Sequence, residues 1–117
     1  PGAFDIPFAC QALANQGGFV ALVALGCVVR GETSHFEYVA GECARGVMEA
    51  GIATGIPIAF GVLTTDSIEQ AKIRSDVNAL AGSNTGESKK SVRPSNKGWE
   101  AAEAALELAA VIKYKTT

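Results

Sequence analysis

The chain has 117 residues, of which 48% are apolar, and its formal net charge at pH 7 is −2. This length predicts one domain over residues 1–117, and the near-balanced charge argues against a nucleic-acid partner. Every apolar stretch is shorter than the roughly 20 residues of a membrane-spanning helix, so no membrane partner is predicted either.

The three cysteines, Cys10, Cys27 and Cys43, are far apart and lie in apolar stretches. An odd number at such spacing fits neither a disulfide framework nor a metal site. We therefore predict three small core residues and no bound metal. Reduced cysteines are typical of the cytoplasm or of the interior of an organelle such as a plastid.

The first predicted elements are a short helix and a buried strand. After an extended segment that contains Asp5, Pro7 suits the first turn of a helix over Phe8–Asn15, which Gly17 then ends. The apolar stretch Phe19–Val29 predicts a strand that is covered on both faces, as in parallel sheets.

A long amphipathic helix is predicted over Ser34–Thr54. Ser34 and Glu37 have the spacing of a capping box at its start, and Gly55 with Pro57 ends it. Its apolar residues recur at helical spacing and are expected to face the core: Phe36, Val39, Ala40, Cys43, Val47 and Ala50.

A second buried strand is predicted over Ile56–Leu63, and a helix follows it from Asp66 through about Val77. Asp66 and Glu69 repeat the capping-box spacing at the start of that helix.

The last part of the chain is predicted to be a polar loop and a helix. Asn78–Ser95 is rich in Ser, Gly, Asn and Lys and is long for an ordered connection. Ser95 or Asn96 caps a helix that runs through about Tyr114. One face of this helix is expected to pack in the core or between subunits: Trp99, Ala102, Leu106, Ala109 or Ala110, and Lys113.

Strands that alternate with helices predict an α/β fold with a parallel sheet and right-handed crossovers. Because two strands cannot bury helices on both faces, we expect one or two further strands from upstream sequence or from another chain. The Pro-Gly start, which has no initiator Met, agrees with missing residues upstream of Pro1.

Both predicted strands lead into polar segments, RGETSH from Arg30 and TTDS from Thr64. Ligands of open α/β sheets bind beyond the carboxyl ends of the strands, where the free N–H groups of the next helix suit an anion. Arg30, Arg74 and Lys97 could add positive charge there. The glycine patterns of nucleoside triphosphate and dinucleotide sites are absent, so those ligands are not expected.

His35 is the only histidine and lies at this edge of the predicted sheet. Imidazole can accept and return protons there, because the positive end of a helix dipole disfavours the imidazolium ion. A surface histidine on a first helical turn fits the spacing equally well. Glu32, Glu37 and Glu100 are further acid–base candidates, although the last two fit helix starts better. Asp5 fits polar ligand recognition and a solvent-facing position equally.

Four segments together resemble the 6,7-dimethyl-8-ribityllumazine synthase family: PGAFDIP from Pro1, ALGCVVRGETSHFEYVAGE from Ala24, PIAFGVLTTDSIEQAKIR from Pro57 and NKGWEAAEAALELA from Asn96. The resemblance implies a flavodoxin-like three-layer fold and an enzyme that needs no cofactor or metal. It implies the penultimate step of riboflavin biosynthesis, in which 5-amino-6-ribitylaminouracil condenses with 3,4-dihydroxy-2-butanone 4-phosphate. The products are 6,7-dimethyl-8-ribityllumazine, phosphate and water.

By position, the resemblance assigns proton transfer to His35, the substrate phosphate to Arg74 and orientation of the histidine to Glu100. The other assigned positions bind substrate: Phe4, Asp5, Cys27, Val28, Val29, Glu32, Thr33, Phe60 and Lys97. It also implies that Phe60, Lys97 and Glu100 come from an adjacent subunit, because the sites of this family lie between neighbours in a pentamer. Outside the resemblance, Phe60 reads as a core residue of the second strand.

Two departures from the family pattern are expected to matter. The first strand and helix of the family, and most of its second strand, lie upstream of Pro1, and the connection between Arg74 and Asn96 is longer than usual. This insertion at about 78–95 is polar and basic, which predicts a homopentamer in place of a sixty-subunit shell. The resemblance also allows riboflavin synthase as a partner.

Two alternatives keep the fold without this reaction: a shell or scaffold subunit with weak turnover, and a lumazine- or flavin-binding protein. The joint presence of His35, Arg74 and Asp5 argues against the first, because packing alone does not require them. The phosphate-binding arginine argues against the second, because such ligands need not bring a separate phosphate.

Overall fold

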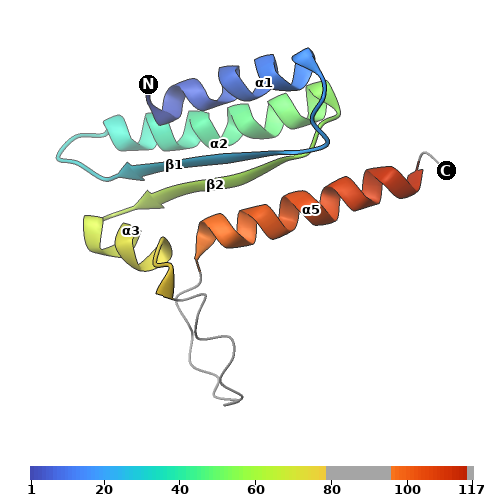
Figure 1. Cartoon of the computed structure of the whole chain (residues 1–117). Coiled ribbons are helices and arrows are strands. Elements are labelled where there is room, and N and C mark those ends of the chain that lie inside the picture. The colour runs from blue at the N-terminus through green and yellow to red at the C-terminus, as the bar shows by residue number, and fades with distance from the viewer. Residues whose placement is uncertain (79–95, 116–117) are drawn as a thin grey trace.

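The computed structural model describes residues 1–78 and 96–115. Its elements in chain order are η1 (Ala3–Asp5), α1 (Ile6–Gln16), β1 (Leu22–Val29), α2 (His35–Thr54), β2 (Ile58–Thr65), α3 (Ile68–Arg74) and α5 (Lys97–Lys115). β1 and β2 are paired in parallel, with α1 and α2 on one face of the sheet and α5 on the other (Figure 1). This arrangement confirms the predicted three-layer α/β fold.

The two strands pair in one unbroken register, from Leu22 opposite Ile58 to Val29 opposite Thr65. Because side chains alternate along a strand, Ala24 and Val62 point to the same face of the sheet. There they pack with helix residues in the larger core cluster: Cys10, Ala24, Cys43, Val47 and Val62. Cys43 and Val47 belong to the predicted apolar stripe of α2, which the structure confirms.

The opposite face of the sheet carries a smaller cluster, formed by Ala59 of β2 with Ala101 and Ala105 of α5. α5 lies close to the sheet here, because a Cβ atom at Gly61 would be only 3.1 Å from that of Ala101. Helices therefore lie on both faces of β2 as predicted, although Phe60 is 42% exposed. β1 is not covered on both faces, since Leu25 on the α5 side is 62% exposed.

The predicted helix starts needed three corrections. Residues Ala3–Asp5 form a 3₁₀ turn and not an extended segment, because the Asp5 carboxylate accepts a 3.0 Å hydrogen bond from the Gly2 N–H. Ser34 makes no side-chain cap, because the Glu37 N–H donates to the Ser34 backbone carbonyl at 3.0 Å, and the Glu37 carboxylate contacts Arg30. The cap of α3 is Ser67 and not the predicted Asp66, since the Ser67 hydroxyl accepts a hydrogen bond from Gln70 N at 3.2 Å.

Two helix ends also bear on the predictions. α3 ends at Arg74, earlier than the predicted Val77, because the Ser75 hydroxyl donates to the Ala71 carbonyl at 2.9 Å and competes for the last turn. At the start of α5, the Asn96 side chain accepts from Trp99 N at 2.9 Å, which confirms Asn96 as a cap. Apart from Asn78, the predicted loop Asn78–Ser95 lies outside the described residues.

Two predictions of burial in the core were wrong within this chain, and the alternative for α5, packing between subunits, stays a prediction. The buried face of α5 is formed by Ala101 and Ala105, whereas Leu106 of the predicted stripe is 73% exposed. Small side chains face the sheet because α5 approaches it closely at Gly61. Cys27 is exposed, in contrast to the buried Cys10 and Cys43, because no described helix covers the end of β1 on its side.

Further strands in the sheet and a single domain over the whole chain stay predictions.

None of the described helices combines the length and hydropathy that a bilayer crossing requires.

Gly46 of α2 tests the contact between the first two helices, because a Cβ atom there would lie 2.6 Å from the Pro7 ring. We expect Gly46→Ala to lower the free energy of unfolding by about 1–3 kcal/mol through overpacking. Gly41→Ala on the same helix is the matched control, since no heavy atom lies within 4 Å of its new Cβ. It should raise stability by roughly 0.5–1 kcal/mol through helix propensity.

Urea denaturation of both variants at one protein concentration measures the difference. Equal stability of the two alanine variants would contradict the close packing of α1 on α2.

Candidate active site

A pocket of about 280 Å³ lies at the carboxyl end of β1, where the chain turns into α2. Its lining includes five of the residues assigned from the sequence: Cys27, Val28, Val29, Thr33 and His35. A neighbouring pocket of about 410 Å³ is lined by Gly2, Ala3, Phe4, His35, Tyr38 and Val39. His35 lines both pockets, so the structure brings it together with Phe4 and the end of β1.

His35 is the first residue of α2. Its backbone N–H contacts the Thr33 hydroxyl oxygen at 3.4 Å, and the next turn closes by a 3.0 Å bond from Glu37 N to the Ser34 carbonyl. The imidazole is therefore carried by a helix start, whose free N–H groups favour a bound anion.

Arg30, directly after β1, makes contacts that the sequence did not reveal. Its Nε donates to the Asp66 carboxylate at 2.8 Å and its Nη1 donates to the Glu37 carboxylate at 3.2 Å. The guanidinium also lies 4.5 Å from the centroid of the Phe36 ring. We call Arg30, Glu37 and Asp66 the arginine clasp.

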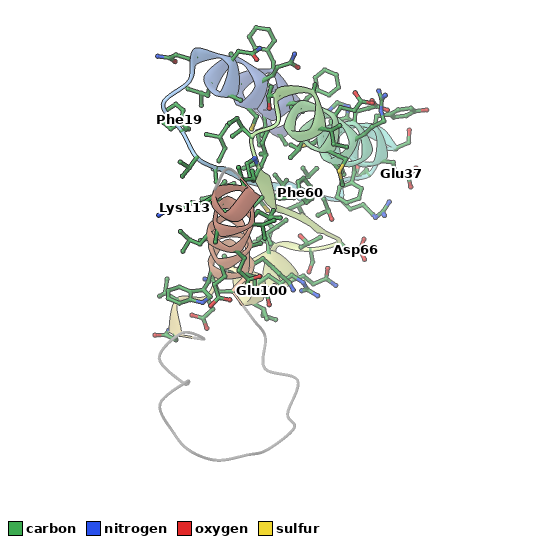
Figure 2. All side chains as sticks on the ribbon, turned by 90° about the vertical axis from the view of Figure 1, so that its right-hand side faces the viewer. Phe19, Glu37, Phe60, Asp66, Glu100 and Lys113 are labelled. Carbon is green, nitrogen blue, oxygen red and sulfur yellow. The ribbon has the colours of Figure 1, made fainter. Side chains whose placement is uncertain are left out.

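The clasp fixes the orientation of Arg30. The hydrogen bonds that the guanidinium donates to Asp66, first, and to Glu37 raise its pKa. Figure 2 shows Glu37 and Asp66 on the same side of the molecule, although they belong to α2 and to the end of β2. The sequence did not predict this contact, because the second strand was expected to end at Leu63, whereas the register pairs Val29 with Thr65 and places the next residues, Arg30 and Asp66, side by side.

Arg74 ends α3 and is exposed. Its Nη1 donates to the Gln70 carbonyl at 3.2 Å, and it makes no ion pair with any carboxylate of the described residues. Its positive charge is thus more available to a ligand than that of Arg30. Arg74 does not line either pocket that contains His35.

Three assigned residues lie on other parts of the chain. Lys97 and Glu100 pair at 2.9 Å on the first turn of α5, and Figure 2 shows Glu100 well apart from Glu37. Phe60 lies in the middle of β2. None of the three lines the His35 pockets, so one chain does not bring them to that site.

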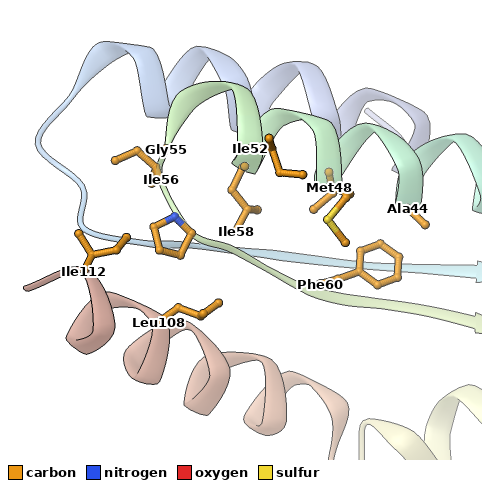
Figure 3. A pocket seen from close by; sticks show the side chains of 12 residues that line it. Ala44, Met48, Ile52, Gly55, Ile56, Ile58, Phe60, Leu108 and Ile112 are labelled. Carbon is orange, nitrogen blue, oxygen red and sulfur yellow. The ribbon is translucent and has the colours of Figure 1, made fainter. Parts of the chain in front are cut away.

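Phe60 belongs to an apolar groove of about 560 Å³ between α2, β2 and α5. Figure 3 shows Met48, Ile52 and Leu108 around the same space. Met48 is 66% exposed and Ile52 is 76% exposed, so this groove leaves large apolar side chains in contact with solvent. Phe60 is therefore not the core residue that its place in a strand suggested.

The two remaining assigned residues are exposed carboxylates. Asp5 caps η1 through Gly2 N and follows Phe4 directly, while Glu32 lies in the connection from β1 to α2. Neither lines the His35 pockets.

No group of three His, Cys, Asp or Glu side chains in residues 1–78 and 96–115 is arranged to hold a metal ion. The three cysteines are free thiols. Burial raises the pKa of the Cys10 and Cys43 thiols, which makes them poor nucleophiles. Proton transfer and anion binding are the chemistry that the described side chains support.

A comparison with protein families agrees with this chemistry. The family model of 6,7-dimethyl-8-ribityllumazine synthase matches residues 1–113. The matched region contains the His35 pockets, the arginine clasp and Arg74, and it also contains Phe60, Lys97 and Glu100.

Proposed function

The chain belongs to the 6,7-dimethyl-8-ribityllumazine synthase family, and we propose that lumazine forms in the pocket that His35 lines at the end of β1. The protein is an enzyme of riboflavin biosynthesis, and its reaction is the lumazine-forming condensation. The substrates are 5-amino-6-ribitylaminouracil and 3,4-dihydroxy-2-butanone 4-phosphate, and phosphate and water leave. The placement of His35 between two pockets at a strand end is the observation that carries the assignment of the site.

His35 is the proposed proton carrier. Joining an amine to a ketone and expelling phosphate and water requires protons to move among nitrogen, carbon and oxygen atoms. Imidazole suits this task because it accepts and returns protons near neutral pH. His35 is exposed in the pocket and therefore accessible to a substrate.

Arg74 is the proposed ligand of the substrate phosphate. An arginine can bind phosphate through two parallel N–H groups, and the contact is strengthened by its charge. Arg74 has no carboxylate partner among the described residues that would compete for those groups. Glu32 and Thr33 at the start of α2 are proposed to assist through the backbone and hydroxyl groups beside the helix N-terminus.

The ribitylaminouracil is proposed to bind along the end of β1. The backbone of Cys27, Val28 and Val29 offers hydrogen-bonding groups to the pyrimidine edge, since these residues line the pocket. Phe4 supplies an aromatic face in the neighbouring pocket, and Asp5 beside it supplies a carboxylate for the ribityl hydroxyl groups. No cofactor or metal is required by these roles.

Phe60, Lys97 and Glu100 are proposed to complete the site of a neighbouring subunit in a homopentamer. Two observations support this. These residues lie outside the His35 pockets of their own chain, and the apolar groove around Phe60 is open to solvent. Apolar surface of this kind marks contacts between proteins.

A sixty-subunit shell is not proposed, because the connection from Arg74 to Asn96 is long and carries Lys89, Lys90 and Arg93. The proposed location is the cytoplasm or the interior of an organelle such as a plastid, which the free cysteines support. Riboflavin synthase, which uses lumazine, is a proposed partner.

His35→Ala is expected to lower turnover by roughly ten- to ten-thousand-fold, because water replaces a positioned acid–base group poorly. Steady-state lumazine formation in the intact protein measures this, and circular dichroism controls for folding. Wild-type turnover in the folded variant would remove the proton-transfer role.

Arg74→Ala is expected to weaken binding of the butanone phosphate by about ten- to one-hundred-fold, because one charge-assisted contact is worth roughly 1.5–3 kcal/mol. Binding of the ribitylaminouracil should change little. Lys72→Ala is the matched control, since Lys72 is an exposed cation of the same last turn of α3. Calorimetry with each substrate separates the two effects, and equal losses for both substrates would contradict the assignment.

The shared site predicts complementation between two impaired subunits. His35→Ala and Glu100→Gln chains, mixed equally and reassembled, should regain activity. A site is intact where a Glu100→Gln chain supplies His35 and its His35→Ala neighbour supplies Glu100, which is expected for roughly a quarter of the sites in a random ring. Analytical ultracentrifugation should show five copies. Activity that stays at the level of the separate variants would contradict the shared site, and hollow sixty-subunit particles would contradict the pentamer.

A further inference from the structure

We propose that Arg30 is a positioning residue for the reaction, which holds the β1–α2 connection in place through the arginine clasp so that His35 stays at its working position. The inference rests on the proposed role of His35 in proton transfer. It assigns Arg30 a mechanical task and not a contact with substrate.

The first step of the argument is the anchor on β2. The strand register ends with Val29 opposite Thr65, and Arg30 extends it by a 2.8 Å hydrogen bond from its backbone N–H to the Thr65 carbonyl. Its Nε then donates to Asp66, the next residue on that side, at 2.8 Å. Backbone and side chain of Arg30 are thus both fixed to the end of β2.

The second step is the reach to α2. The Nη1 of the same side chain contacts Glu37, seven positions along the sequence, at 3.2 Å. The guanidinium also lies 4.5 Å from the centroid of the Phe36 ring, and Phe36 lines the pocket together with His35. Arg30 therefore contacts the two residues that directly follow His35 and ties them to β2.

The third step is that the β1–α2 connection has few other side-chain hydrogen bonds. Ser34 provides no side-chain cap to α2. The only side-chain hydrogen bond found there within the described residues is the 3.4 Å contact of Thr33 with His35 N. Among the described residues, Arg30 thus provides the side-chain hydrogen bonds that connect the first turn of α2 to the end of β2.

The exposure of the clasp separates positioning from stability. Arg30 is 44% exposed, and its two partners are exposed still further. Exposed ion pairs contribute little to the stability of the fold. A reaction is far more sensitive, because a catalytic group displaced by about 1 Å can slow it by roughly a hundredfold.

The rival role for Arg30 is direct binding of the substrate phosphate. The geometry disfavours it, because both Nε and Nη1 are already directed at carboxylates. Two substitutions distinguish the roles. Arg30→Lys keeps the positive charge but loses the planar fork that spans two carboxylates. Asp66→Asn leaves the arginine intact but removes the charge that anchors it.

The experiment measures kcat, KM for each substrate and the melting temperature of the intact protein. Arg30→Ala should lower kcat by about ten- to one-hundred-fold with both KM values within about threefold. Arg30→Lys and Asp66→Asn should each retain less than about half of the wild-type kcat. Arg45→Ala is the matched control, because Arg45 also pairs with two carboxylates, Glu42 and Glu49, on the surface of α2. Its kcat should stay at the wild-type value.

Melting temperatures of the Arg30 and Arg45 variants should differ little, because both sets of ion pairs are exposed. Wild-type kcat in Arg30→Lys or in Asp66→Asn would overturn the proposal. A raised KM for the butanone phosphate alone would also overturn it, in favour of direct phosphate binding. If Arg30→Ala does not fold, Asp66→Asn decides the question.

His35→Ala measured in parallel separates the clasp from the proposed function. Loss of turnover in His35→Ala without loss in Arg30→Ala overturns the clasp alone. Wild-type turnover in His35→Ala overturns the role of His35 itself.

Discussion

The pairing of β1 with β2 is the constraint on which the rest of the molecule depends. Their parallel register brings both strands to an end at the pair Val29 and Thr65, so the segments that follow emerge side by side. A parallel pair also needs a crossover, and α2 provides it along one face of the sheet (Figure 1). The start of α2, which carries His35, is thereby held at the edge where β2 gives way to α3. A register shifted by one residue would separate Arg30 from Asp66 and turn the apolar residues to the wrong face.

The two faces of the sheet are filled differently, and this difference connects packing with the proposed assembly. Val47 and Cys43 of α2 fill the larger cluster, whereas the residues of α5 that are buried against the sheet are alanines beside Gly61. Small residues permit a close approach but bury little apolar area. The larger side chains Leu108 and Ile112 of α5 stay partly exposed and line the groove beside β2. The proposed neighbouring subunit would cover the open groove around Phe60 and would account for the absence of Phe60 from the His35 pockets of its own chain.

The sequence was sufficient where periodicity is strong and insufficient where local partners compete. The stripe of α2 repeats at helical spacing, so its buried residues were predictable. The capping box at Ser34 was predicted wrongly, because the Glu37 N–H donates to the Ser34 backbone carbonyl and the Glu37 carboxylate accepts from Arg30. The face of α5 was missed because an alanine-rich helix has a weak apolar stripe. The pocket at the end of β1 followed from the rule for parallel sheets, whereas the roles of Lys97 and Glu100 came from resemblance, since one chain does not bring them to His35.

The cations near the strand ends differ in what they can still bind, and this divides their tasks. Arg30 faces two carboxylates, so one guanidinium and its partners carry a combined charge of −1. Lys97 is paired with Glu100, while Arg74 contacts a neutral carbonyl. A phosphate dianion is repelled by a group with a net negative charge and attracted by an uncompensated cation. These contacts support the proposed division, in which Arg74 binds the phosphate and Arg30 holds the connection that carries His35. Counting arginines in the sequence could not separate these tasks, because the distinction lies entirely in which carboxylates the fold brings within reach.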